Sequence, residues 1–319
     1  MGTTILNKIS TYFANPIKKK DETPKTFSPA LKQLEKDTVS FSGNKSKTLN
    51  YFASELNTIG KRVSGDFEAM CKRIFGEHFE TSRVKATCSI ENKLGRKILP
   101  DEKLTTQKAI TLIKDLLASR GVTDGSKESI NVFVNRLCEE IKKGSCKITE
   151  IRNYRGVINE AEEKIITPYF SKEHLQKIKE AHPLIKPKTK ESKGKISSGY
   201  TATHILGTIK GVPFEFQIKG NCVKTVDDGT HLLHSIDLGK SYIKGKKIPE
   251  EIKEIAELYE NLSPKKREIH DKYITNCYNR ARIAELKGTK LILAPAPKEI
   301  PFELTIPHLI ARAKEFGYT

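Results

Sequence analysis

Several features are missing from this sequence of 319 residues, and each absence narrows what the protein can be. There is no tryptophan and no long apolar run, so the sequence predicts no transmembrane helix. The N-terminus lacks the apolar segment of a secretory signal. The six cysteines are scattered without a Cys-x-x-Cys pair, which argues against a zinc site or a disulfide framework. These absences predict a cytoplasmic protein with reduced thiols and no membrane partner.

Acidic residues are fewer than basic ones. Lysine and arginine together number 57 and aspartate and glutamate 39, which gives a net charge of +18. Such a charge imbalance indicates what the protein binds rather than how it folds, because a strongly positive surface attracts polyanions. We therefore expect a partner that carries phosphates, such as a nucleotide or RNA, or an acidic surface.

Composition and apolar spacing divide the chain into three regions. Residues 1–46 are rich in lysine, threonine, serine, asparagine and proline and predict a disordered basic tail. Residues 47–247 hold the predicted folded domain. The remaining residues, 248–319, predict a helical C-terminal region with helices at 250–262, 264–286 and 306–316.

Within the folded domain, helical and strand patterns alternate. Apolar residues between 47 and 79 recur at helical spacing and predict one long helix or two short ones, with Gly65 as the expected break. The stretch 183–195 is predicted to be flexible and basic. Further helices are expected at 104–114, 127–143 and 171–182, and strands at 83–85, 115–121 and 146–154.

The stretch from 199 to 219 predicts two strands joined at Lys210-Gly211. The second strand alternates strictly between apolar and polar residues. On a strand, its apolar residues point to one side and its polar ones, Glu215, Gln217 and Lys219, to the other. One side can therefore pack on a core while the other offers a row of functional groups. A solvated edge strand would show the same alternation.

Two further segments carry charged residues at informative spacing. Arg83 and Lys85 share one face of a short strand, and Ser89 can cap a following helix that carries Lys93. A basic strand-to-helix junction suits a polyphosphate, although a solvated basic helix has the same composition. Five positions separate Asp115 from Arg120, so they lie on opposite faces of a regular strand unless one is at a strand end or a bulge.

These segments resemble, in order, the motifs of the RelA/SpoT-type synthetase domain. Gly199-Tyr200 with His204, followed by Glu215-x-Gln217-Ile218-Lys219, is similar to the family's Gly-Tyr-x-x-x-His and Glu-x-Gln-Ile-Arg signatures. The resemblance covers about residues 80–240, and the other matching positions are Arg83, Lys85, Ser89, Lys93, Asp115, Arg120, Asp228 and His231. The chain departs from the family at Asn153, Thr201 and Lys219, and its link from 155 to 198 is longer than the usual ten or so residues.

The resemblance implies an α/β fold in which a nucleotidyltransferase-like mixed sheet of about five strands is flanked by helices. It also implies an ATP-dependent pyrophosphokinase that requires Mg²⁺. In that scheme Asp115 and Glu215 are the catalytic residues and the metal ligands. The ATP-binding residues would be Arg83, Lys85, Ser89, Lys93 and Arg120, and the acceptor-binding residues Tyr200, His204, Gln217, Lys219 and His231.

Several alternatives remain open at this point. The acceptor can be GDP or GTP, giving the alarmone (p)ppGpp, or the 3′ end of tRNA, as in the family's toxin branch. A non-enzymatic nucleotide- or RNA-binding module is a third possibility, and the presence of both Asp115 and Glu215 counts against it. Simple structural roles also compete: Asp115 as a strand-end cap, His204 as a core histidine and Tyr200 as packing. The sequence gives neither the oligomeric state nor any regulator such as an antitoxin.

Overall fold

The computed structural model describes residues 45–98, 104–155, 157–159, 164–165, 168–182, 188–193, 199–237, 242–243 and 246–317. The predicted N-terminal tail therefore lies almost entirely outside the described residues. No helix in the described part of the chain is long and apolar enough to cross a membrane.

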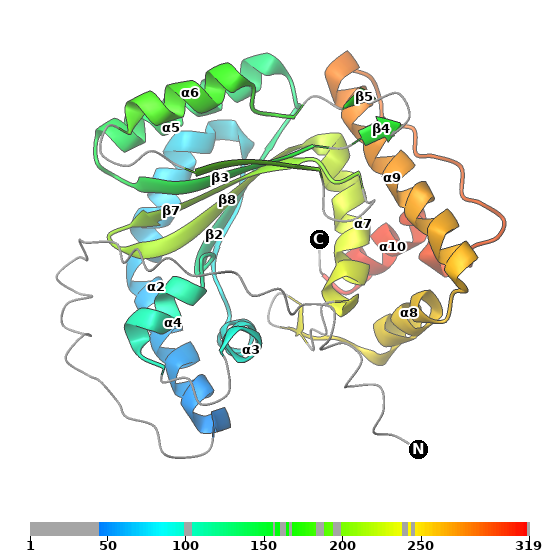
Figure 1. Ribbon diagram of the computed structural model, residues 1–319, viewed down its shortest axis with the longest axis horizontal. Helices are drawn as coiled ribbons and strands as arrows, with labels where there is room; N and C mark the ends of the chain where they lie inside the picture. The colour runs from blue at the N-terminus through cyan, green and yellow to red at the C-terminus, as the bar shows by residue number, and fades with distance from the viewer. Residues whose placement is uncertain are drawn as a thin grey trace.

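A mixed sheet lies at the centre of the described chain (Figure 1). Its six strands follow the order β1-β2-β8-β7-β3-β6, in which the β2–β8 and β3–β6 pairs are parallel and the others antiparallel. The strands are β1 (Phe79–Val84), β2 (Leu117–Thr123), β8 (Val212–Gly220), β7 (Ala202–Ile209), β3 (Lys147–Arg155) and β6 (Lys188–Lys193). The predicted α/β fold with a mixed sheet flanked by helices is confirmed. The sixth strand, β6, arises from the stretch predicted to be flexible, so that part of the prediction is wrong.

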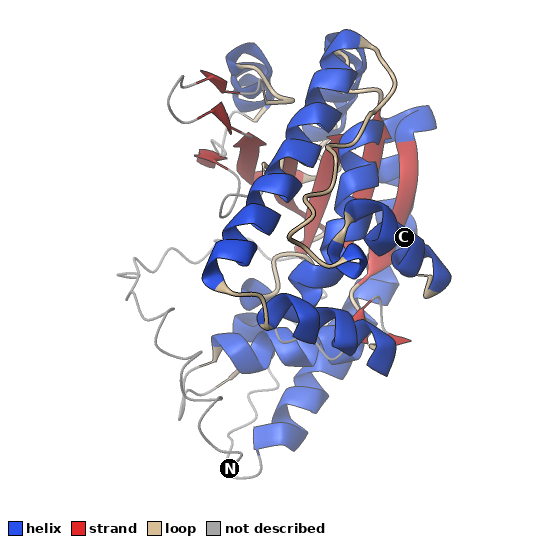
Figure 2. Cartoon of the chain, turned by 90° about the vertical axis from the view of Figure 1, so that its right-hand side faces the viewer, coloured by secondary structure: helices blue, strands red, loops and turns tan. Residues whose placement is uncertain are grey.

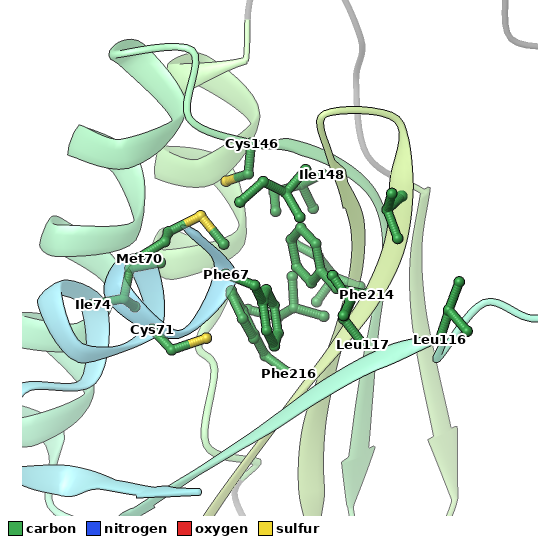
Figure 3. Close-up of a cluster of buried hydrophobic side chains, with 14 of the residues drawn as sticks. Phe67, Met70, Cys71, Ile74, Leu116, Leu117, Cys146, Ile148, Phe214 and Phe216 are labelled. Atoms are coloured by element: carbon green, nitrogen blue, oxygen red, sulfur yellow. The ribbon is translucent and has the colours of Figure 1, made fainter. Parts of the chain in front are cut away.

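The apolar face of the sheet is covered by three helices: α2 (Lys45–Phe75), α5 (Lys127–Lys142) and α6 (Lys172–Ala181). The alternation along β8 places Phe214 and Phe216 on this face, and both are fully buried. Phe67 of α2 stacks on Phe216 with ring centroids 5.8 Å apart, as Figure 3 shows. This aromatic contact fixes α2 against the strand that also carries Glu215. The chemistry of the other face is thus tied to a packed core.

The expected break in the first helix is wrong. Helix α2 continues through Gly65 without interruption. A Cβ atom at Gly65 would meet nothing within 4 Å, so this glycine is not required by packing. One exposed glycine costs a helix interior only about 1 kcal/mol. The apolar stripe buried along the rest of α2 outweighs that cost.

Two short helices and one longer helix flank the polar face. They are α3 (Thr87–Lys97), α4 (Thr106–Leu112) and α7 (Asn221–Asp237). Helix α3 follows β1 after two residues, and α7 begins directly after β8. The helices that follow β1 and β8 thus carry charged residues beside the polar face. The helices expected at 104–114, 127–143 and 171–182 are confirmed as α4, α5 and α6.

The C-terminal region forms three further helices, as predicted. They are α8 (Glu250–Glu260), α9 (Pro264–Lys287) and α10 (Ile306–Glu315). Helices α9 and α10 both pack on α7, and in Figure 2, where the right-hand side of Figure 1 faces the viewer, they lie in front of the strands. A buried pair on α9, Arg282 and Glu285, joins this region to the sheet. Arg282 donates to the carbonyl of Gly125 at 3.0 Å, and Glu285 accepts the backbone N–H of Val223 at 2.8 Å.

Candidate active site

One face of the sheet gathers polar side chains from neighbouring strands. In the register of the strands, Gln217 of β8 lies between Arg120 of β2 and His204 of β7, and Arg152 of β3 lies beyond His204. Glu215 is two residues before Gln217 and therefore shares this face. Residues that are distant in the sequence are thus placed in adjacent rows. The interpretation of β8 as a solvated edge strand is wrong, because β8 lies inside the sheet between β2 and β7.

Asp115 lies at the entrance to this face, in the turn just before β2. Within a regular strand, the five-residue spacing would place Asp115 and Arg120 on opposite faces. Asp115 precedes the strand, so this restriction does not apply to it. The Nζ atoms of Lys85 and Lys93 contact its two carboxylate oxygens at 2.7 and 2.6 Å. Burial raises the pKa of Asp115, but the charges of the two lysines outweigh it and hold that pKa well below its usual range.

The two lysines come from different elements around one junction. Lys85 follows β1 directly, and Lys93 is one and a half turns into α3. Burial lowers the pKa of Lys85, against the opposing charge of Asp115. Arg83 is exposed on β1, and its charge also lowers the pKa of Lys85. The junction is therefore crowded with positive charge and has one carboxylate as its counter-ion.

Ser89 does not cap α3, contrary to the expectation. The helix begins at Thr87, and Ala86 is its N-cap residue, with no side-chain hydrogen bond to the first turn. Ser89 is instead in that first turn, where its backbone N–H donates to the carbonyl of Ala86 at 2.9 Å. Its role in binding ATP stays a prediction.

Glu215 is the second carboxylate of the site. Its Oε1 lies 3.2 Å from Nδ1 of His204, and its Oε2 accepts the amide of Gln217 at 2.9 Å. Burial and the like charge of Asp115 raise the pKa of Glu215, whereas His204 and Gln217 lower it, leaving it at about 2. Asp115 precedes β2, the strand that pairs with β8 beside Glu215. Both carboxylates have lowered pKa values and are therefore ionised at neutral pH.

Tyr200 and His204 continue the site from β7 toward the C-terminal region. The Tyr200 hydroxyl lies 2.9 Å from Nε2 of His204, so His204 links Tyr200 to Glu215. Tyr154 of β3 contacts both rings edge-on, with centroid distances of 5.8 Å to Tyr200 and 4.9 Å to His204. His204 is thus part of a chain of polar contacts that ends at a carboxylate, rather than an isolated core histidine.

Lys219 is buried at the end of β8, and its predicted contact with the acceptor stays a prediction. Its side chain is 1% exposed, and its Nζ pairs with Asp227 of α7 at 2.5 Å. The same ammonium lies over the ring of Tyr200, 5.3 Å from the centroid. Burial lowers the pKa of Lys219, while Asp227 opposes that shift. Lys219 therefore acts on the site through Tyr200.

Arg120 is on β2, whereas the other predicted ATP-binding residues lie on β1, on α3 or between them. Its guanidinium is 3.5 Å from Glu80 and 3.7 Å from Asp228, while Lys224 bridges the same two carboxylates. The structure thus brings Lys85 and Lys93 together at Asp115 and places Arg120 in a separate charged cluster. His231 is half-buried on α7, where its charge lowers the pKa of Asp227.

The sequence interpretation missed three residues of this site. Asp227 pairs with Lys219, and Arg152 and Tyr154 share the polar face through β3. The two-residue period of a strand links Tyr154 to Arg152, so that signal was available in the sequence. Nothing in the sequence distinguishes Asp227 from its neighbour Asp228. Only the rotation of α7 against β8 selects between them.

The two carboxylates fit a magnesium ion. Mg²⁺ usually takes one or two carboxylates and completes its octahedral shell with water and substrate phosphates. Asp115 and Glu215 meet this demand, because each carboxylate oxygen retains an acceptor position beyond its present partner. In the described part of the chain no group of three or more His, Cys, Asp or Glu residues gathers for a metal.

Comparison with known proteins gives similarity to solved structures only. No protein-family model matches the chain, and no curated protein matches it. Small alarmone synthetase 1 from Bacillus subtilis is 14% identical with a TM-score of 0.37, over 74% of this chain and 91% of that one. A GTP pyrophosphokinase family protein from Streptococcus pneumoniae is 16% identical with a TM-score of 0.29, over 76% and 98%. Both similarities are too low to assign a function to this chain.

Proposed function

We propose that this protein transfers pyrophosphate from ATP to the 3′ hydroxyl of GDP or GTP and so makes (p)ppGpp. One observation carries the proposal: Asp115, paired with Lys85 and Lys93, lies two residues before β2, and Glu215, bound by His204 and Gln217, lies on β8, the strand that pairs with β2. Pyrophosphate transfer needs charge neutralisation on the phosphates, a metal and a group near the attacking hydroxyl. The site supplies residues for each of these three needs, and they are the residues that the motif resemblance implies.

The lysines and Arg83 would bind the phosphates of ATP. They surround the start of α3, where the first backbone N–H groups of the helix also favour an anion. Asp115 and Glu215 would hold Mg²⁺, which supplies positive charge to the phosphate oxygens when bound. ATP would replace Asp115 as the partner of one or both lysine ammonium groups. Their present pairing keeps both side chains oriented toward the place where phosphates would bind.

Glu215 would receive the proton of the attacking hydroxyl. It is ionised at neutral pH, where its low pKa makes it a weak base, so its position rather than its basicity supports this role: His204 and Gln217 fix both of its oxygens. The 3′ oxygen of the acceptor attacks the β-phosphorus of ATP, and the bond from that phosphorus to the oxygen of the α-phosphate breaks. AMP leaves with that oxygen, and the hydroxyl proton passes to Glu215.

The acceptor would bind on the Tyr200 side of Glu215. Tyr200 offers an aromatic ring to a purine base, since stacking on an aromatic side chain contributes about 1–3 kcal/mol per base. His204 contacts both the Tyr200 hydroxyl and Glu215, and Gln217 donates to the other oxygen of Glu215. A base on Tyr200 would therefore place its ribose toward the carboxylate.

The nature of the product tests the proposal. ATP labelled in its terminal phosphates is incubated with the protein and Mg²⁺, with GDP, GTP and tRNA offered side by side. We expect labelled guanosine 3′-pyrophosphate and an equal amount of AMP. Label transferred only to tRNA would move the proposal to the second acceptor, and the absence of any transfer would overturn it.

A specific observation favours tRNA as the second candidate acceptor. Strand β6 adds a row beyond β3, and its backbone at Lys188 and Lys190 pairs in register with Glu150 and Arg152. The sheet thereby extends by one strand beyond β3. Lysines of this segment, Lys186, Lys188, Lys190, Lys193 and Lys195, could contact the phosphates of a longer acceptor.

A further inference from the structure

The Gly-Tyr motif lies against helix α9 of the C-terminal region. Gly199 has a φ of +63°, and a Cβ atom at this position would come within 2.9 Å of the Thr275 carbonyl oxygen and 3.1 Å of Cβ of Tyr278. Any other residue would therefore push α9 away or strain the backbone. The glycine permits direct contact between the start of β7 and α9. Because of this contact, the residue that follows it, Tyr200, is placed by the C-terminal region as well as by the sheet.

A buried polar network continues from α9 to the ring of Tyr200. The hydroxyl of Tyr278 on α9 donates to Oδ1 of Asp227 at 3.4 Å and lies 2.5 Å from Oγ1 of Thr230. Oδ2 of Asp227 pairs with Nζ of Lys219, which lies over the face of Tyr200. The ring of Tyr278 also meets Tyr200 edge-on, at 5.9 Å and 87°.

We propose that Asp227 and Tyr278 are positioning residues for acceptor binding, and that α9 thereby completes the acceptor subsite. The inference rests on the proposed function, in which Tyr200 stacks on the acceptor base. Asp227 holds the Lys219 ammonium over the ring of Tyr200, and Tyr278 contacts both the carboxylate and that ring. The ring is then held in one orientation for the base.

Free-energy considerations indicate that the network orients Tyr200 more than it stabilises the fold. A buried ion pair recovers little free energy beyond its own desolvation, and apolar residues of the same volume often stabilise a protein as well or better. Such a pair does fix geometry, because each ion loses several kcal/mol if its partner moves away. A cation over a ring adds about 0.5–2 kcal/mol and is sensitive to where the ring lies. Loss of the network should therefore affect acceptor affinity more than folding.

The test separates the two substrates of the reaction. In Tyr278→Phe only the hydroxyl is lost, and in Lys219→Met/Asp227→Asn the ion pair is replaced by near-isosteric neutral groups. Initial rates are measured for the acceptor that the parent protein uses, and for ATP, each at saturating amounts of the other. We expect the acceptor KM to rise about two- to tenfold in Tyr278→Phe, the value of one hydrogen bond. A larger rise is expected in the double variant, with the KM for ATP unchanged in both.

Tyr273→Phe is the matched control. Tyr273 lies on the same helix, is equally buried, and its hydroxyl accepts the backbone N–H of Ile306 at 3.1 Å, away from Tyr200. It should change thermal stability about as much as Tyr278→Phe and leave both KM values unchanged. Equal rises for acceptor and ATP, or no rise in either Tyr278→Phe or the double variant, would overturn the inference. An inactive parent protein would overturn the proposed function first, so the two failures are distinguishable.

Discussion

Asp115 is bound by two ammonium groups, and this pairing gives it a role that a strand-end cap would not have. Its two oxygens neutralise Lys85 and Lys93, which would otherwise repel each other. A cap would accept backbone N–H groups, whereas these contacts come from side chains on two other elements. The carboxylate therefore organises the phosphate side of the site.

Replacement of this carboxylate should impair turnover with little effect on folding. In Asp115→Asn the carboxylate that is the proposed metal ligand and the counter-ion of both lysines loses its charge, so we expect kcat to fall about 10²- to 10³-fold, the scale of a lost preorganised electrostatic contact. The rate of AMP formation and the thermal unfolding midpoint are measured together. Asp66→Asn is the control, because Asp66 pairs with Lys210 in an exposed salt bridge and should leave the rate unchanged. An Asp115→Asn protein with parental activity would remove Asp115 from the site.

Single residues differ in how well the sequence predicts them. Glu215 and Gln217 follow from strict alternation, because a strand with a two-residue period has only two faces. Asp227 could not be identified, since consecutive helical residues point about 100° apart and the sequence does not say which direction meets Lys219. The burial of Lys219 could not be predicted from the sequence either, because it depends on how α7 and α9 pack over the end of β8.

At the scale of elements, the strand pair β7–β8 is the best predicted part of the fold. Its turn is at Lys210-Gly211, where both residues have positive φ, as a tight hairpin requires. Strand β6 could not be predicted, because Lys188–Lys193 is rich in lysine, contains no aromatic residue and has Thr189 as its one residue of a type typical of strands. It forms by pairing with the exposed edge of β3, a long-range contact that local sequence does not encode.

Helices α2 and α5 are joined by an ion pair whose loss should be visible in acid. Nε and Nη2 of Arg73 donate to the two carboxylate oxygens of Glu140, at 3.0 and 2.8 Å, and this pairing lowers the pKa of Glu140 from 4.5 to about 2. A lowered folded-state pKa means that the stabilisation is complete above pH 4.5 and is lost as the pH falls toward 2. In Glu140→Gln the free energy of unfolding should therefore fall less steeply over this interval.

Urea unfolding at a series of pH values measures that slope. The exposed neighbour Glu139 on the same helix supplies the control variant Glu139→Gln, which should keep the steep acid limb of the parent protein. Identical limbs for Glu140→Gln and the parent protein would show that Arg73 and Glu140 do not stabilise the fold through their charges. The measurement does not depend on catalytic activity, so it tests the packing of α2 on α5 alone.

In the molecule as a whole, the two faces of the sheet have different roles. The apolar face buries aromatic side chains against α2 and α5, while the polar face and the helices beside it carry the charged groups. The C-terminal helices close one end of that polar face through Arg282 and Glu285. The predicted boundaries of the three regions stay a prediction, but α9 is in direct contact with the motif that begins at Gly199.

The net charge of +18 allows the two acceptors to be distinguished by salt. A free nucleotide is bound chiefly by stacking on Tyr200, whereas a tRNA is also bound through phosphates along its stem, and each neutralised phosphate releases counterions. For GDP or GTP, we expect neutralising the lysines of the 186–195 segment to leave product formation nearly unchanged and Tyr200→Ala to abolish it. The lysines to be changed together to glutamine are Lys186, Lys188, Lys190, Lys193 and Lys195. Rates are compared at two salt concentrations, and a large, salt-dependent loss of tRNA labelling, with no (p)ppGpp from the parent protein, would establish tRNA as the acceptor.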